Sequence, residues 1–197
     1  MSDLQAYLEK RLREIIGSWD EDDIFAISFF VYANEDYEYR GFSNVSTFSV
    51  SYNTEQHCAG AGALSEERWN YAFWPQNETA IIEADDENEG MKILFDWYEE
   101  KGIENIGYED YESAYDEEMN YIGKGPVGYY ELLSEVSALA GRLQKSGFIK
   151  EKFGRAIPII VHDLEYPWYV MVATATANPN GEADIFLAAM KELGYWE

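Results

Sequence analysis

A chain of 197 residues that is 47% hydrophobic and 16% aromatic can bury a substantial core, which excludes an intrinsically disordered protein. Its 38 acidic and 14 basic side chains give a formal net charge of −24, which excludes nucleic acid and anionic membranes as partners. No apolar run approaches the ~18 residues that span a membrane, and the acidic residues Asp3 and Glu9 are untypical of a signal peptide. The single cysteine, Cys58, cannot form an internal disulfide. We therefore expect a cytoplasmic protein.

The first predicted elements are a helix and two strands. Apolar residues of the first 17 positions fall on one helical stripe, with Ser2 or Asp3 as the cap and Gly17 at the end. Ile24–Tyr32 contains eight apolar or aromatic residues out of nine, which predicts a central strand covered on both faces. Val45–Tyr52 alternates apolar and small polar residues, which predicts a half-buried strand antiparallel to the first.

The next predicted elements are shorter and lie between acidic loops. Ser65 and the two glutamates after it begin a short helix that ends before Pro75. Thr79–Glu83 is predicted as a short strand. An acidic loop then leads into a helix with its apolar stripe in Met91–Tyr98 and its end at Gly102.

Tyr108–Ile122 is the most unusual part of the sequence. Tyrosine, methionine and isoleucine recur at helical spacing, and six acidic residues fill the positions between them. The spacing predicts a helix, although like charges with no bases among them oppose it.

The last third is predicted to add a helix, a hairpin and a final helix. Tyr129–Leu143 has a clear apolar stripe. Ile157–His162 and Trp168–Ala175 are interpreted as the two strands of a hairpin, and Asn178 and Pro179 as the cap and first residue of the final helix. The prediction is one α+β domain over residues 1–197, with a mixed or antiparallel sheet of four to five strands flanked by four to five helices.

Few residues carry recognisable catalytic chemistry. Cys58, His162 and Asp163 supply a thiol, a base and an orienting acid, which is the composition of a thiol enzyme, but no local signature accompanies Cys58. A lone cysteine among small residues is also typical of a structural role. We predict no metal and no cofactor, because no metal-type Cys/His spacing and no phosphate-binding glycine loop is present.

The acidic excess is concentrated in one part of the chain and is interleaved with tyrosine. Residues 20–118 carry 26 acidic and four basic side chains. Tyrosine supplies buried contact area with a polar tip, and carboxylates select a basic partner, so the combination is typical of an interface. The alternatives are that the tyrosines pack inward and that Arg68–Trp74 is a wedge in the core. The predicted binding residues are Tyr108, Asp110, Tyr111, Glu112, Tyr115, Asp116 and Glu117, together with Arg68 and Trp69.

Three short motifs resemble an uncharacterised bacterial family, domain-of-unknown-function family 4303. They are Tyr52-Asn53-Thr54-Glu55, the aromatic segment Arg68–Trp74, and Asn178-Pro179, while the acidic stretch from Asp85 to Glu118 departs from the family. The resemblance implies no catalytic residues. Similar small acidic families occur beside bacterial toxins, which makes an immunity role an analogy.

We therefore predict a non-enzymatic acidic binding protein, an immunity protein that neutralises a basic toxin or nuclease being one form of it. The alternatives are an enzyme that uses Cys58 and His162, and a housekeeping scaffold that associates with itself. Any partner is expected to be a basic protein, with neither nucleic acid nor membrane involved.

Overall fold

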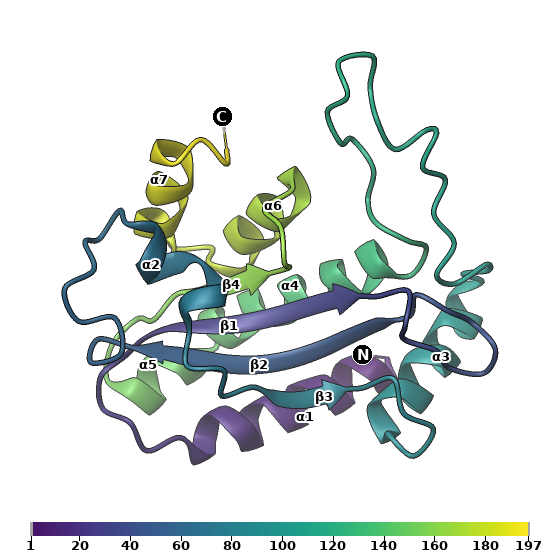
Figure 1. Cartoon of the computed structure of the whole chain (residues 1–197). Helices are drawn as coiled ribbons and strands as arrows, with labels where there is room; N and C mark the ends of the chain where they lie inside the picture. Colours follow the sequence, from purple (N-terminus) through teal and green to yellow (C-terminus); the bar gives the residue numbers. More distant parts are fainter. Residues whose placement is uncertain (1, 197) are drawn as a thin grey trace.

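The computed structural model describes residues 2–196 and is built on one four-stranded mixed sheet, in the order β3-β2-β1-β4 (Figure 1). The strands are β1 (Ile24–Ala33), β2 (Ser46–Thr54), β3 (Thr79–Ile82) and β4 (Ile159–His162). β2 lies antiparallel to both β1 and β3, whereas β4 lies parallel to β1. The predicted α+β class is confirmed, and of the mixed or antiparallel sheet of four to five strands that was predicted, the structure has the mixed form with four strands.

β1 is the central strand because both of its faces are covered. Its first six residues are all buried, as the unbroken apolar run predicts. A bulge at Phe25 interrupts the pairing with β2 between Ile24 and Ala26. The bulge turns the Phe25 ring toward Trp69, with the ring centroids 5.5 Å apart.

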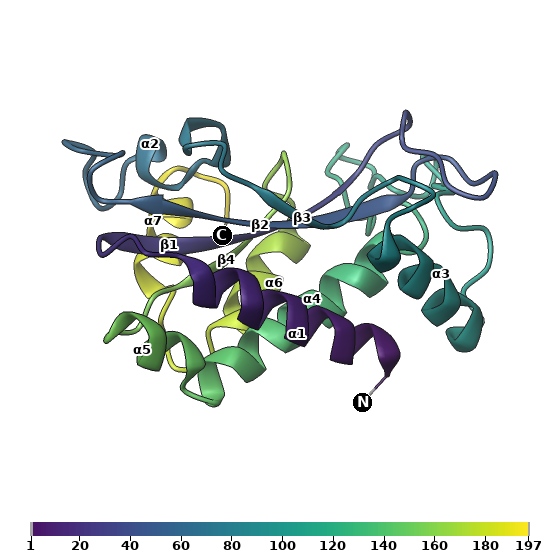
Figure 2. The same ribbon diagram turned by 90° about the horizontal axis from the view of Figure 1, so that it is seen from below.

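Three long helices cover one face of the sheet and each was predicted from its apolar stripe. They are α1 (Asp3–Ser18), α3 (Glu89–Lys101) and α4 (Tyr129–Lys145). Figure 2 shows α1 and α4 running beneath the strands. Ser2 caps α1 by accepting a hydrogen bond from the Gln5 amide, and Gly102 ends α3 in the left-handed conformation.

Five shorter elements complete the cover: Phe148–Phe153 packs beside α1 and α4, and the other four lie over the opposite face or along the outer edge of β4. They are α2 (Glu66–Trp69), the 3₁₀ helix η1 (Tyr71–Phe73), α5 (Phe148–Phe153), α6 (Trp168–Ala177) and α7 (Asp184–Glu192). The described chain thus contains seven α-helices, more than the four to five predicted, because α5 was not predicted and α6 was interpreted as a strand, while α2 lies within the short helix predicted from Ser65. On this face the Tyr71 ring stacks on Phe30 at 4.6 Å.

The predicted hairpin after residue 157 is wrong. Its first strand exists as β4, but Trp168–Ala177 is helical, and Pro167 sets its start with φ −65°. Asn178 ends α6 instead of capping the final helix, which begins at Asp184. The free edge of β4 is satisfied by side chains: the Ile159 amide donates to Asn178 Oδ1 at 2.9 Å, and the Val161 amide donates to Thr174 Oγ1 at 3.0 Å.

The predicted helix over Tyr108–Ile122 is also wrong. This segment consists of turns and one isolated bridge between Tyr115 and Tyr121. Six carboxylates without a basic residue among them repel one another along a helix, and Met119 adopts a positive φ of 65° that no helix interior allows. Among residues 2–196, no helix is long and apolar enough to cross a membrane.

Candidate functional site

Residues 108–122 form a loop that stands away from the body of the protein, which we call the acidic loop (Figure 1). Two backbone hydrogen bonds of 2.9 Å close its base, one from the Gly107 amide to the Val127 carbonyl and one from the Val127 amide to the Tyr108 carbonyl. At its tip the Asp116 carboxylate accepts hydrogen bonds from the amides of Glu118 and Asn120. The side-chain amide of Asn120 also donates to Asp116, and this bond, together with the two backbone bonds, lowers the pKa of Asp116 and keeps its charge at the turn.

Three of the four tyrosines in the acidic loop are exposed to solvent, contrary to the alternative that they pack inward, and the fourth, Tyr121, is half-buried. Tyr108 is 63% exposed, Tyr111 is 56% exposed and Tyr115 is 41% exposed. Several exposed aromatic rings in one loop are unusual on a monomeric protein, because leaving such rings in water is less favourable than burying them.

The carboxylates of the acidic loop have no positive partner within the chain as described. Asp110, Glu112 and Glu117 are exposed, and Asp116 is half-buried. The ion pairs found over residues 2–196 all lie elsewhere, for example between Arg68 and Glu55. The loop therefore presents uncompensated negative charge together with aromatic surface.

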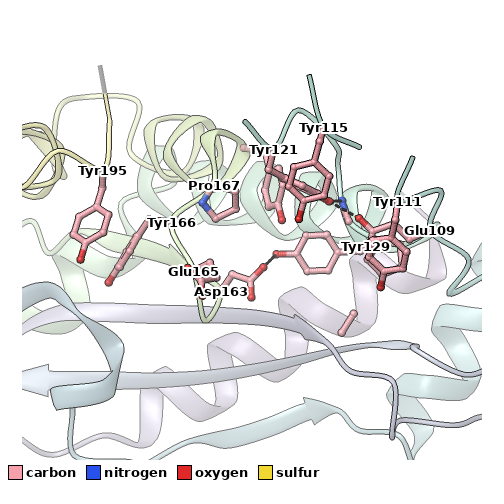
Figure 3. A pocket seen from close by; sticks show the side chains of 14 residues that line it. Glu109, Tyr111, Tyr115, Tyr121, Tyr129, Asp163, Glu165, Tyr166, Pro167 and Tyr195 are labelled. Carbon is pink, nitrogen blue, oxygen red and sulfur yellow. Dashed lines mark hydrogen bonds between the residues drawn. The ribbon is translucent and has the colours of Figure 1, made fainter. Parts of the chain in front are cut away.

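A cavity of about 580 Å³ lies between the acidic loop and the carboxyl ends of the two parallel strands, β1 and β4. Ligands commonly bind at the carboxyl ends of parallel strands, where the chain leaves the sheet and side chains converge. Seven tyrosines and three acidic residues contribute to its lining (Figure 3). They are Tyr111, Tyr115, Tyr121, Tyr129, Tyr166, Tyr169 and Tyr195, with Glu109, Asp163 and Glu165.

Asp163 lies in the cavity wall directly after β4. Its Oδ2 atom accepts a 2.6 Å hydrogen bond from the buried Tyr129 hydroxyl, and its Oδ1 atom accepts one from the Leu164 amide. Burial raises the pKa of Asp163, although the hydrogen bond from Tyr129 opposes this effect. Burial and the neighbouring Asp163 charge raise the pKa of Tyr129 far above its usual value, so the phenol remains a hydrogen-bond donor.

Glu109 and Tyr121 are hydrogen-bonded to each other in the opposite wall of the cavity. The Tyr121 hydroxyl donates to Glu109 Oε1 at 2.6 Å and accepts from the Gly125 amide at 2.7 Å. The Tyr115 ring packs against Tyr121 with the centroids 5.3 Å apart. The acidic loop thereby forms part of the cavity wall.

A second tyrosine pair borders the cavity near the C-terminal end of the chain. The rings of Tyr166 and Tyr195 lie 5.0 Å apart, and Figure 3 shows Tyr166 between Tyr195 and Glu165. Tyr195 is 42% exposed, while Tyr169 is buried against Tyr129 at 5.6 Å. Aromatic rings thus border the cavity on both sides of Asp163.

Arg68 and Trp69 lie outside this site, and the burial of Trp69 argues against its prediction as a binding residue, while Arg68 is half-buried. Trp69 is 3% exposed and packs between Phe25 and Phe186, as the core-wedge alternative proposes. The Arg68 guanidinium lies 3.8 Å from the centroid of the Phe25 ring and is paired with both oxygens of Glu55. Figure 1 shows that Arg68 and Trp69 belong to α2, which lies near one end of the sheet, while the acidic loop lies near the other end.

Cys58 and His162 have separate surroundings. The Cys58 thiol contacts the Thr54 carbonyl and Arg68, and burial raises its pKa, which disfavours the thiolate. His162 is fully buried, with Nδ1 bonded to the Ser28 hydroxyl at 2.8 Å and Nε2 donating to the Trp69 carbonyl at 3.1 Å. Both ring nitrogens are therefore occupied by structural contacts.

The cavity residues Tyr129, Tyr166, Tyr169 and Tyr195 were not predicted as site residues, and Asp163 was considered only as the orienting acid of the thiol-enzyme alternative. The signal available in the sequence was Asp163 and Glu165 directly after a buried strand, with Tyr166 beside them. This signal was not recognised because Trp168–Ala175 was interpreted as the second strand of a hairpin. In that interpretation Asp163, Glu165 and Tyr166 are simply residues of the turn.

In comparisons with protein-family models, with curated proteins and with solved structures, nothing matches the chain. The resemblance to domain-of-unknown-function family 4303 stays a prediction.

Proposed function

We propose that this protein is a non-enzymatic binding protein that uses its acidic loop to neutralise a basic protein partner in the cytoplasm. The observation that supports this proposal is that Tyr108, Tyr111 and Tyr115 are exposed among carboxylates that have no ion-pair partner in the described chain. A toxin nuclease is the kind of basic protein that such a loop fits, because carboxylates take the positions that phosphates occupy on its nucleic-acid surface.

The carboxylates and the tyrosines have different roles in the proposed binding. The carboxylates attract the partner over a distance and raise the association rate by roughly 10- to 1,000-fold at low salt. The tyrosines bury their rings after contact, and their hydroxyls remain hydrogen-bonded at the edge of the interface. A specific complex of this kind buries about 1,600 Å² in total.

The test is capture of the partner from the native host, followed by measurement of its affinity at several salt concentrations. We expect the dissociation constant to rise by at least ~10-fold between 50 and 300 mM salt, because exposed charges are screened over about 10 Å at 0.1 M. An affinity that ignores ionic strength contradicts the proposal.

A matched pair of variants locates the interface. The loop variant carries Asp110→Asn, Glu112→Gln, Asp116→Asn and Glu117→Gln. The control carries Asp20→Asn, Glu83→Gln, Asp86→Asn and Glu100→Gln, which are exposed residues outside the acidic loop. Both variants lose four negative charges, so net charge alone affects them equally, and only the loop variant is expected to lose most of its affinity. Equal losses contradict a specific role of the acidic loop.

A further inference from the structure

We infer that the cavity between the acidic loop and the strand ends binds a linear aliphatic polyamine. This ligand is a small molecule with several ammonium groups, and its binding requires no protein partner. The inference does not rest on the function proposed for the acidic loop, although Tyr111 and Tyr115 line the cavity and also belong to the surface proposed to bind the protein partner.

The charge of the cavity wall selects a cation. Glu109, Asp163 and Glu165 line the cavity, and none of the described residues in its wall is lysine, arginine or histidine. Asp163 is partly buried, and among residues 2–196 it receives hydrogen bonds only from Tyr129 and the Leu164 amide, both of which are neutral donors. A partly buried carboxylate without a countercharge gains free energy when a cation enters beside it.

The tyrosines select an organic cation. The Tyr166 and Tyr195 rings, 5.0 Å apart, border one side, and the Tyr115 and Tyr121 rings, 5.3 Å apart, border the other. Ring faces attract an ammonium group within ~6 Å, and their edges pack against methylene groups. The volume of about 580 Å³ also lies within the ~300–1,000 Å³ range of small-molecule sites.

The spacing of the carboxylates favours a ligand whose charges are spread along a chain. Over residues 2–196, no three His, Cys, Asp or Glu side chains converge in the manner of metal ligands. In Figure 3 Asp163 and Glu165 lie near the middle of the row of tyrosines, and Glu109 lies beside Tyr111 at one end. An alkyl chain with ammonium groups at intervals places a charge at each of these positions and its methylenes against the rings between them.

The experiment is calorimetric titration of spermidine into the full chain in 150 mM NaCl, where diffuse attraction to an acidic surface is screened. We expect one saturable site, weaker binding of putrescine, and little competition from an equal charge of Mg²⁺. Binding without saturation, or complete displacement by Mg²⁺ at equal charge, overturns the inference, because either result describes a diffuse ion atmosphere.

Single substitutions separate the cavity from general charge. Asp163→Asn is expected to weaken spermidine binding by at least ~10-fold. Asp86→Asn removes the same charge from an exposed loop and is expected to change the affinity by less than ~2-fold. Equal effects of the two substitutions overturn the inference.

Tyr195 provides a test that does not depend on the buried residues, because it is 42% exposed and its replacement leaves the core intact. Tyr195→Phe keeps the ring face and is expected to retain affinity within ~2-fold. Tyr195→Ala removes the ring and is expected to weaken binding by about 5-fold. Unchanged affinity of the alanine variant contradicts the assignment of the tyrosines as cation-binding rings.

Discussion

Asn178→Ala is expected to destabilise the protein by about 2–4 kcal/mol, although the side chain lies in a loop after α6. The Asn178 amide makes four hydrogen bonds and is 5% exposed. It accepts from the Ile159 amide and from Gln144, and it donates to the carbonyls of Ile159 and Thr174 at 2.7 and 2.8 Å. Each bond contributes roughly 0.5–1.5 kcal/mol net, and the truncation leaves buried backbone groups of β4 without partners.

The measurement is urea unfolding followed by tryptophan fluorescence. For a typical slope, a loss of this size lowers the midpoint by about 1–2 M urea. Asn178→Asp is expected to be as destabilising, because the carboxylate keeps the two acceptor roles but faces the carbonyls of Ile159 and Thr174 without a donor. Hydrogen exchange at the Ile159 amide should accelerate in both variants, since this amide loses its bond or its local order.

Asn180→Ala is the matched control for this prediction. Asn180 is exposed, and within the described residues its side chain bonds to Glu182 alone. Its truncation should cost less than about 0.5 kcal/mol. If the two alanine variants unfold at the same urea concentration, the claim that the hydrogen bonds of Asn178 stabilise the edge of β4 is incorrect.

Three further predictions test other buried features. Burial lowers the pKa of His162 to about 3, so between about pH 6.5 and pH 3 the unfolded chain takes up a proton that the folded chain does not. The free energy of unfolding should therefore fall by up to about 1.4 kcal/mol per pH unit on acidification. His162→Gln should remove this part of the slope between about pH 6.5 and pH 5, as measured by urea unfolding at each pH. Gly107→Ala should cost at least ~2 kcal/mol more than Gly41→Ala in thermal or urea unfolding, because both glycines have φ above +80° but only at Gly107 does an added Cβ meet backbone, 1.8 Å from the Ser43 carbonyl oxygen. Cys58, 9% exposed and with a raised pKa, should react with an aromatic disulfide reagent at least ~10-fold more slowly in the folded protein than in urea, and fast labelling of the folded protein would favour the thiol-enzyme alternative.

The elements that sequence patterns predicted correctly are those with a local signal. β1 is an unbroken apolar run, and α4 has a regular stripe that ends before Gly147 in the left-handed conformation. Neither depends on which segment packs against it, so pattern alone is sufficient.

α6 was missed because its signal is not local. It packs against α4 on one side and β4 on another, so its apolar residues are distributed around the helix and form no stripe. Its valines and threonines favour a strand by propensity, and tertiary packing overrides that preference. The buried set Tyr169, Ala173 and Ala177 does follow the four-residue spacing of a helix.

The site was predictable only in part for a related reason. The exposure of Tyr108, Tyr111 and Tyr115 follows from their acidic neighbours, which cannot be buried without partners. The cavity requires the parallel pairing of β1 with β4, which brings Asp163 beside residues far away in sequence. No pattern within a single segment contains that information.

The closed base of the acidic loop makes the loop separable from the fold. Because the hydrogen bonds between Gly107–Tyr108 and Val127 hold the two ends together, insertions, deletions and substitutions beyond this point leave the strands and their covering helices in place. The sequence and length of the loop can therefore change in evolution, or by grafting in the laboratory, while the sheet and its helices keep their fold.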